Sequence, residues 1–251
     1  DPRNGAKFDF WAFHGYAPVC RITQNGEIFT APTRRTVTPL GGIAGIVEVR
    51  KRLDENGWQD RAMIDTEHTG LARANPLSPE FDVFDAAYVA QELIVKRSLS
   101  LNGKTVLAGI VALKVRARSP VGQGEEAWGS LGPDGSMTET VTSAGTVIST
   151  LRDYRHERRV GGEFDDESTA WIELFSSGDN RELYAFFRPF RSHDDGSIAL
   201  ERDELAIAID LERTPRTVTL IDIAGERTSI APSQLLELSA TNAPKFLELE
   251  Y

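Results

Sequence analysis

The hydrophobic pattern of roughly the first 155 residues alternates between strand-like runs and helical stretches. Three short runs of apolar and aromatic side chains have the pattern of buried strands: residues 8–16, 61–66 and 104–115. Three longer stretches repeat apolar side chains at helical spacing: residues 41–57, 82–98 and 138–154. Gly57 stands where a glycine that caps a helix C-terminus belongs. The predicted order is therefore strand, helix, strand, helix, strand, helix.

This alternation predicts a parallel sheet covered by helices. Buried strands without polar alternation, separated by helices, are typical of parallel sheets. The segments after the predicted strands are long, whereas those after the predicted helices are short. That asymmetry favours a (β/α)-barrel, in which function resides in the loops that follow the strands.

The pattern changes near Arg155, and a second domain is predicted from there to the C-terminus. Residues 155–168, "RHERRVGGEFDDES", are interpreted as a polar bridge. Short alternating strands separated by turns with Gly, Asp, Asn and Pro follow, as in "TAWIELF", "ELYAFFRPF", "ELAIAIDL", "RTVTLIDI", "ERTSIA", "QLLELSA" and "KFLELEY". This spacing indicates an antiparallel β-sandwich. The predicted domains are therefore residues 1–155, a partial (β/α)-barrel, and residues 156–251, a β-sandwich.

Composition narrows the range of partners. The chain has 251 residues and a net charge of −10, which argues against nucleic acid or an anionic membrane as the main partner. Cys20 is the single cysteine, so neither an internal disulfide nor a thiolate metal cluster is expected. No apolar run reaches the roughly 20 residues that a membrane span requires.

Polar and aromatic residues gather where the predicted strands end. The first strand ends in "HGY" with His14 and Tyr16, the second ends in Thr66 and Glu67 followed by His68, and Trp128 lies in the loop after the third. In a barrel these ends point at one mouth. Aromatic rings stack on pyranose faces and polar groups bond hydroxyls, so the combination outlines a sugar site.

With these motifs, the sequence resembles the second half of the clan A glycoside hydrolases, which are retaining (β/α)8 (TIM) barrel enzymes. "DFWAFHGY" is similar to the sixth strand of that family, and "GIVEVRKRLDENGWQDRAMIDTEHTG" to its sixth helix and seventh strand. "FDAAYVAQELIVKRSLSLNGKTVLAGIVAL" resembles helix seven and strand eight, and "EAWGSLGPDGSMTETVTSAGTVISTLRDY" the last loop and helix. The tail from "RELYAFFRP" onwards resembles the β-sandwich of xylosidase-like members.

The resemblance implies a role for each candidate residue. Glu67 would be the catalytic nucleophile, and His14 or Tyr16 would orient it through a hydrogen bond. His14, Tyr16, His68 and Trp128 would contact the substrate, with Trp128 as a wall of the sugar subsite. No cofactor is expected. A metal held by His14, Glu67 and His68 is disfavoured because no HxH or HExxH spacing supports it.

The sequence departs from the family in one essential respect. A retaining glycosidase needs a second carboxyl group as acid and base, which in the family follows an Asn at the end of strand four. Strands one to five have no counterpart in this chain. A partial barrel would expose an unpaired strand edge, so a partner is expected. The partner could be a separate N-terminal half of the barrel or a second copy of this chain. A third possibility is that these elements form an arrangement other than a barrel. A separate N-terminal half, which gives a hetero-oligomer, is preferred.

The sequence is therefore consistent with two functions. One is a glycoside hydrolase subunit or fragment that cleaves glycosidic bonds with retention, its acid/base supplied from elsewhere. The alternative is a non-catalytic carbohydrate-binding or scaffolding subunit that kept the fold. The absence of an initiator Met suggests that the chain begins where a segment was removed, and an extracellular or periplasmic location is favoured.

Overall fold

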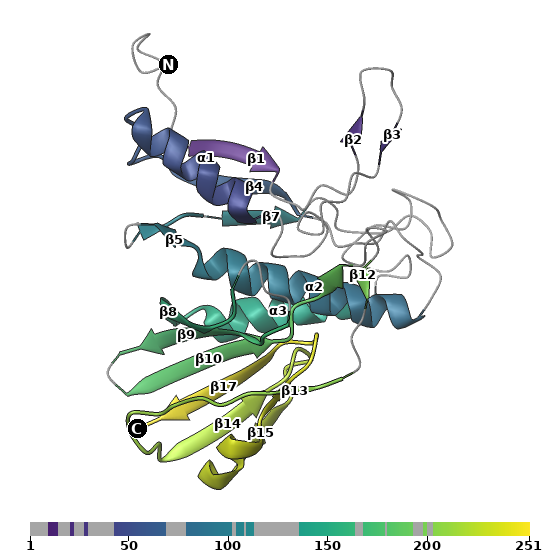
Figure 1. The fold of residues 1–251 in the computed structure, drawn as a ribbon, viewed down its shortest axis with the longest axis vertical. Coiled ribbons are helices and arrows are strands. Elements are labelled where there is room, and N and C mark those ends of the chain that lie inside the picture. The colour runs from purple at the N-terminus through teal and green to yellow at the C-terminus, as the bar shows by residue number, and fades with distance from the viewer. Residues whose placement is uncertain are drawn as a thin grey trace.

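The computed structural model describes most of the two predicted parts. The described residues are 10–14, 21–22, 28–29, 43–68, 79–101, 104–107, 109–112, 136–163, 168–178, 180–192, 198–199 and 203–251. Within them lie three α-helices, a parallel sheet and a larger antiparallel sheet. Figure 1 shows α2 and α3 lying between these two sheets.

The N-terminal part contains a three-stranded parallel sheet. Its strands are β1 (Phe10–His14), β4 (Ala62–His68) and β7 (Gly109–Ala112), in the order β1-β4-β7. Helix α1 (Ile43–Glu55) connects β1 to β4, and helix α2 (Pro79–Ser98) connects β4 to β7. The predicted alternation of strands and helices with parallel pairing is therefore confirmed for these elements. Three further pairs of short strands lie outside both sheets. In the N-terminal part, β2 (Arg21–Ile22) pairs with β3 (Ile28–Phe29), and β5 (Ser100–Leu101) pairs with β6 (Lys104–Thr105). In the C-terminal part, β11 (Arg191–Ser192) pairs with β12 (Ile198–Ala199).

The connection from α1 to β4 is closed by a glycine cap. Gly57 has φ +82°, its N–H donates to the Asp54 carbonyl, and the Trp58 N–H donates to the Leu53 carbonyl. This pair of bonds is the Schellman motif, so the predicted role of Gly57 is confirmed. The Arg50 guanidinium then donates to the carbonyl oxygens of Trp58 and Arg61, at 2.8 Å and 2.7 Å. These bonds hold the start of β4 against α1.

The C-terminal part is built on a six-stranded antiparallel sheet in the order β15-β14-β17-β10-β9-β8. Its strands are β8 (Arg155–Gly161), β9 (Trp171–Ser177), β10 (Arg181–Phe187), β14 (Thr217–Ile221), β15 (Arg227–Ser229) and β17 (Lys245–Glu250). The antiparallel character was predicted. The interpretation as a polar bridge was wrong for residues 155–161, because they form the edge strand β8, whose charges are typical of edge strands, while residues 164–167 of that stretch lie outside the described residues.

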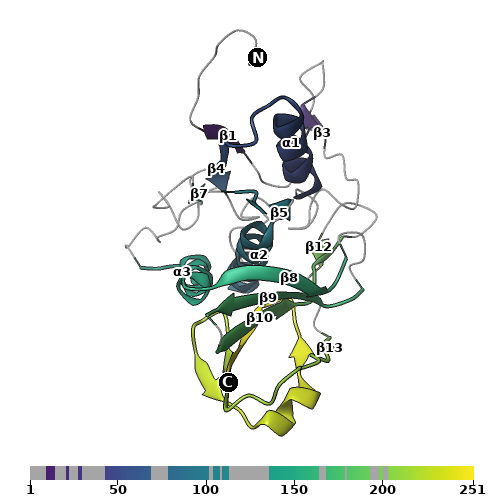
Figure 2. The same cartoon turned by 90° about the vertical axis from the view of Figure 1, so that its left-hand side faces the viewer.

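Each face of this sheet is covered by a different layer. Helices α2 and α3 (Glu139–Leu151) cover one face, and their core cluster includes Trp171, Phe175 and Phe246 of the sheet. The other face packs on a layer that contains β13 (Leu205–Ala206), the 3-10 helix η3 (Pro232–Glu237) and β16 (Ser239–Ala240). Figure 2 shows this layering end on. The strands predicted in "ELAIAIDL" and "QLLELSA" are therefore shorter than expected, and the second begins as a 3-10 helix.

We expect Gly162→Ala to destabilise the junction between β8 and β9. Gly162 has φ +87°, and an added Cβ would lie 2.8 Å from Trp171 Cα and 3.0 Å from the Ala170 carbonyl oxygen. Both neighbours are backbone atoms that cannot move aside, so the substitution should lower the unfolding free energy by about 2–3 kcal/mol. Gly178→Ala is the matched control, because Gly178 has φ +63° with open space around it and should lose only about 1 kcal/mol. Urea unfolding of both variants measures the difference, and equal losses would contradict the steric account.

Stability should fall at high pH because buried tyrosines resist ionisation. Burial, followed by the charge of Glu182 and the hydrogen bond to it, raises the pKa of Tyr184 to about 12. The unfolded value is about 10, so this contribution is present below pH 10 and is lost as pH rises from about 10 to about 12. Tyr184→Phe should reduce the loss of unfolding free energy across that interval by on the order of 1 kcal/mol. Unfolding curves at several alkaline pH values test this, and an unchanged pH slope would refute it.

Candidate functional site

The ends of the three parallel strands meet at one edge of their sheet. Because β1, β4 and β7 run in the same direction, His14, Glu67 and Ala112 all lie at or next to the C-terminal ends. The register pairs His14 with Glu67 directly and His68 with Ala112. Two of the predicted site residues, from segments about fifty positions apart, are therefore brought together on neighbouring strands.

Strand β4 contains one more residue than its neighbours just before Glu67. Along β1 the partners step from Phe13↔Asp65 to His14↔Glu67, so that β4 advances two residues while β1 advances one. The pairing with β7 shows the same excess, stepping from Asp65↔Ile110 to His68↔Ala112. The extra residue relative to β1 is Thr66. Such a β-bulge is a local device that redirects the residues beyond it.

The bulge inverts the alternation of faces along β4. Asp65 lies on the face covered by α2, because its carboxylate is bonded to Lys96 of that helix. Ile64 lies on the opposite face, where its Cγ2 atom is 3.8 Å from the position that a Cβ would take on Gly109. Register partners share a face, and His14 alternates with Phe13, the partner of Asp65. The positions of His14 and Glu67 therefore belong to the face turned away from α2, together with Ile64.

A buried ionic cluster lies behind this strand end. Lys96 of α2 bonds the carboxylate of Asp65 at 2.5 Å and also pairs with Glu92, one turn earlier in the helix. The three side chains are at most 3 % exposed. This cluster could not be predicted from the sequence, because an apolar periodicity identifies the buried face of a helix but not the charged residues that share it. We call Asp65, Glu92 and Lys96 the ionic triad.

The structure describes the five predicted site residues to different extents. Tyr16 and Trp128 lie outside the described residues. His14, Glu67 and His68 are placed through the backbone of β1 and β4. Beyond the bulge, His68 takes the position that alternates with Glu67 and pairs with Ala112. Among the described side chains, no group of three or more His, Cys, Asp or Glu is arranged to hold a metal ion.

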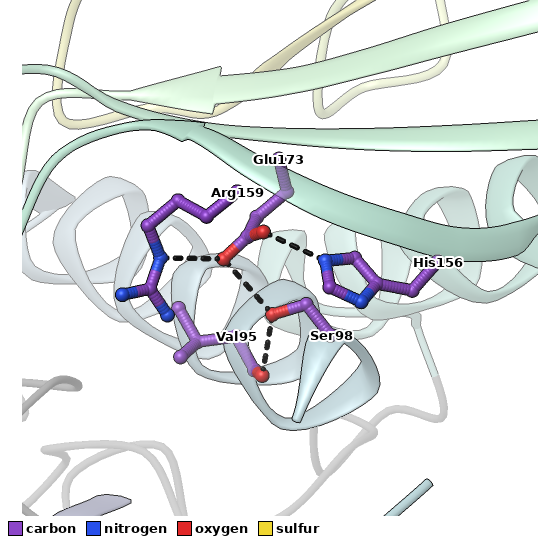
Figure 3. A network of polar contacts seen from close by, with 5 residues as sticks. All are labelled: Val95, Ser98, His156, Arg159 and Glu173. Atoms are coloured by element: carbon purple, nitrogen blue, oxygen red, sulfur yellow. Dashed lines mark hydrogen bonds and ion pairs between the residues drawn. The ribbon is translucent and has the colours of Figure 1, made fainter. Parts of the chain in front are cut away.

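A second polar cluster joins the helices to the antiparallel sheet. The buried carboxylate of Glu173 on β9 accepts bonds from Ser98 Oγ and Arg159 Nε, both at 3.1 Å, and lies 2.8 Å from His156 Nε2 (Figure 3). The single hydroxyl proton of Ser98 is shared with the Val95 carbonyl oxygen, 2.9 Å away, and the Arg159 guanidinium lies 3.8 Å from the centre of the Trp171 ring. Because the carboxylate oxygens are occupied on all sides, this cluster secures α2 to β8 and β9.

A polar hollow of about 620 Å³ lies beside the end of α3, lined in part by Tyr154, Glu157 and Ser176. Its lining includes the carboxylates of Asp153 and Glu157. A hydrogen bond from Ser176, assisted by Arg155, holds the pKa of Glu157 below its usual value, so this group is poorly suited to donate a proton. The strand ends of the parallel sheet remain the better candidate site.

The fold of this chain matches parts of solved structures, among them a glycoside hydrolase and a glucosidase. A family 39 glycoside hydrolase from Bacteroides cellulosilyticus WH2 superposes with a TM-score of 0.58 at 16% identity, covering 96% of this chain and 44% of that one. A glucosidase from Croceicoccus marinus gives 0.54 at 12% identity, covering 99% and 55%. A conserved exported protein from Bacteroides fragilis gives 0.52 at 13% identity, covering 81% and 43%.

These matches show the fold and nothing finer, because all identities are low. The chain spans about half the length of the solved structures it matches. No protein-family model and no curated protein matches the sequence. No helix among the described residues is long and apolar enough to cross a membrane.

Proposed function

We propose that this chain is the C-terminal half of a retaining glycoside hydrolase in which Glu67 is the nucleophile. One observation carries the proposal. The end of the central parallel strand, where the bulge lies, puts Glu67 beside His14 on the face away from the helices. A bulge that redirects one residue at the end of a parallel strand is typical of a functional site.

The reaction assigns each residue a role. The Glu67 carboxylate attacks the anomeric carbon and forms a covalent glycosyl intermediate, while a second carboxylic acid protonates the departing oxygen. The second group then removes a proton from a water molecule as the water oxygen attacks the anomeric carbon, which breaks the bond to Glu67 and releases the sugar with retained configuration. His14 or Tyr16 holds Glu67 in its attacking orientation by a hydrogen bond. Trp128 stacks on the sugar ring and His68 contributes a further contact.

The acid/base is supplied by another half of the barrel. Of the described carboxylates near the strand ends, Asp65 and Glu92 are both bound to Lys96 behind β4. Strand β1 pairs with β4 through one of its edges, and Phe10 and Trp11 on it are 51 % and 38 % exposed. No described strand occupies the other edge of β1. An N-terminal half that adds strands there would cover these side chains and bring an acid to about 5–5.5 Å from Glu67.

A non-catalytic role is the second candidate. The observation that favours it is that neither described carboxylate near the strand ends is available as an acid/base. In that case the chain would bind carbohydrate or act as a scaffold. A location outside the cytoplasm, supported by the similarity to an exported protein, suits either function.

Native isolation tests the proposal. We expect the chain to co-purify with a polypeptide that supplies the first barrel strands, identified by mass spectrometry. The complex should hydrolyse members of a panel of 4-nitrophenyl glycosides, and proton NMR should show that the first-formed sugar keeps the anomeric configuration of the substrate. Inversion would refute the nucleophile role of Glu67. Binding of oligosaccharides without hydrolysis would establish the non-catalytic alternative.

A further inference from the structure

We infer that the ionic triad is a positioning device that fixes where β4 bulges, and thereby where Glu67 stands. The inference rests on the proposed role of Glu67. Asp65 is the last residue of β4 before the bulge, and its carboxylate is the point at which that strand is bonded to α2. Asp65, Lys96 and Glu92 are positioning residues, because they act through the backbone of β4.

The triad adds a directional contact to the apolar packing between β4 and α2. Met63 of β4 and Val89, Ala90 and Ile94 of α2 belong to one hydrophobic cluster. Apolar packing is non-directional, so it restrains sliding of a helix along a strand only through shape. An ammonium group bonded to carboxylates on both elements has one favourable position. Lys96 therefore fixes Asp65 relative to α2.

A buried ionic group is poorly explained by stability alone. Removing charges from water carries a penalty that their attraction roughly offsets, and well-packed apolar residues are often equally stable in their place. The best-attested advantage of such groups is that they select one register among alternatives. Asp65 and Lys96 are almost completely buried, at 0 % and 1 % exposure, so both bear the full penalty of removal from water.

The triad selects one register of β4 relative to its neighbouring strands. The extra residue could be accommodated at more than one place along the strand, and a shift by one residue moves a side chain to the opposite face. A bulge beginning before Asp65 would turn Asp65 away from Lys96 and would break the bond between the two side chains. The observed bulge follows Asp65, which satisfies the triad and assigns Glu67 to the face shared with His14.

Two substitutions of nearly equal size distinguish the effect of the bond that Asp65 accepts from Lys96 from the effect of the Asp65 charge. Asp65→Asn and Asp65→Leu both remove the negative charge, and both leave the Lys96–Glu92 pair in place. Only Asn keeps an oxygen that accepts a bond from Lys96. Amide hydrogen exchange in the complete enzyme should therefore be about tenfold faster at residues 66–68 in Asp65→Leu, and close to wild type in Asp65→Asn. Exchange in β10 and β17 should stay unchanged in both variants.

Kinetics provide the second measurement. A displaced nucleophile should lower kcat of Asp65→Leu by about 100-fold with KM nearly constant, whereas Asp65→Asn should retain most of the turnover. Equal exchange and equal kcat in the two variants would overturn the inference. Asp65→Ala repeats the comparison without added bulk, and global unfolding of both Leu and Ala variants would also overturn it, because the triad would then serve general stability.

The two proposals fail in different ways. If exchange separates Asp65→Leu from Asp65→Asn while Glu67→Gln retains full turnover, the triad fixes β4 but the nucleophile assignment is wrong. If Glu67→Gln is inactive while the two Asp65 variants behave alike, the nucleophile stands and the positioning role is wrong.

Discussion

Glu67→Gln is expected to abolish glycoside turnover in the assembled enzyme while leaving folding and assembly intact. Glutamine keeps the size and shape of the side chain, but its amide does not form the covalent glycosyl intermediate. Loss of a nucleophile lowers kcat by several orders of magnitude, so we expect a decrease of at least about 10⁴-fold. Hydrolysis of 4-nitrophenyl glycosides, followed by absorbance, measures the effect.

The matched control is Glu55→Gln. Glu55 is an exposed carboxylate at the end of α1, so its removal changes the net charge equally without touching the strand ends. This variant should keep turnover within about twofold of the wild type, as exposed substitutions usually do. Turnover of Glu67→Gln similar to that of Glu55→Gln would remove Glu67 from the mechanism.

Lys96→Met is expected to cause the largest loss of stability of any single charge removal among the described residues. It leaves the buried carboxylates of Asp65 and Glu92 without the ammonium group between them. Breaking a buried ionic group by removing one partner costs about 3–5 kcal/mol. Urea unfolding monitored by circular dichroism should report this loss as a lower midpoint.

Two comparisons make this result specific. Lys51→Met removes an exposed lysine from α1 and should change the unfolding free energy by at most about 0.5 kcal/mol. Adding Asp65→Asn and Glu92→Gln to Lys96→Met removes the two buried negative charges that Lys96 balances and should recover much of the loss. A single Lys96→Met variant as stable as Lys51→Met would show that the triad carries no such penalty.

The elements of the N-terminal part could be predicted because their signals are local. Helical spacing and the glycine cap defined α1, which was predicted at 41–57 and begins and ends at Ile43 and Glu55. Helix α3 was predicted at 138–154, and Thr138 caps it by accepting a bond from the Val141 N–H at 3.3 Å. Parallel pairing followed from the alternation of strands and helices.

The errors occurred where tertiary contacts override the local pattern. Strand β8 carries four charged residues and was interpreted as a bridge, because an edge strand needs few apolar side chains. In β9 the charged Glu173 is completely buried, since Ser98, His156 and Arg159 from other segments satisfy it. No pattern within the strand indicates partners that are distant along the chain.

The candidate site was likewise predictable only where local signals determine it. Its position at the strand ends followed from the order of elements, and the register brings His14 beside Glu67. The bulge at Thr66 and the ionic triad could not be predicted, because both depend on how β4 meets β1, β7 and α2 together. The predicted roles of all five site residues remain predictions: His14, Tyr16, Glu67, His68 and Trp128.

The most direct test of the central claim is covalent trapping of the nucleophile. The assembled enzyme is incubated with an activated 2-deoxy-2-fluoroglycoside of a sugar that it hydrolyses, which slows release of the glycosyl intermediate, and is then digested and analysed by tandem mass spectrometry. The account predicts a single labelled peptide from β4 with the sugar on Glu67. A label on any other residue, or hydrolysis of the parent glycoside with no label at all, would contradict it.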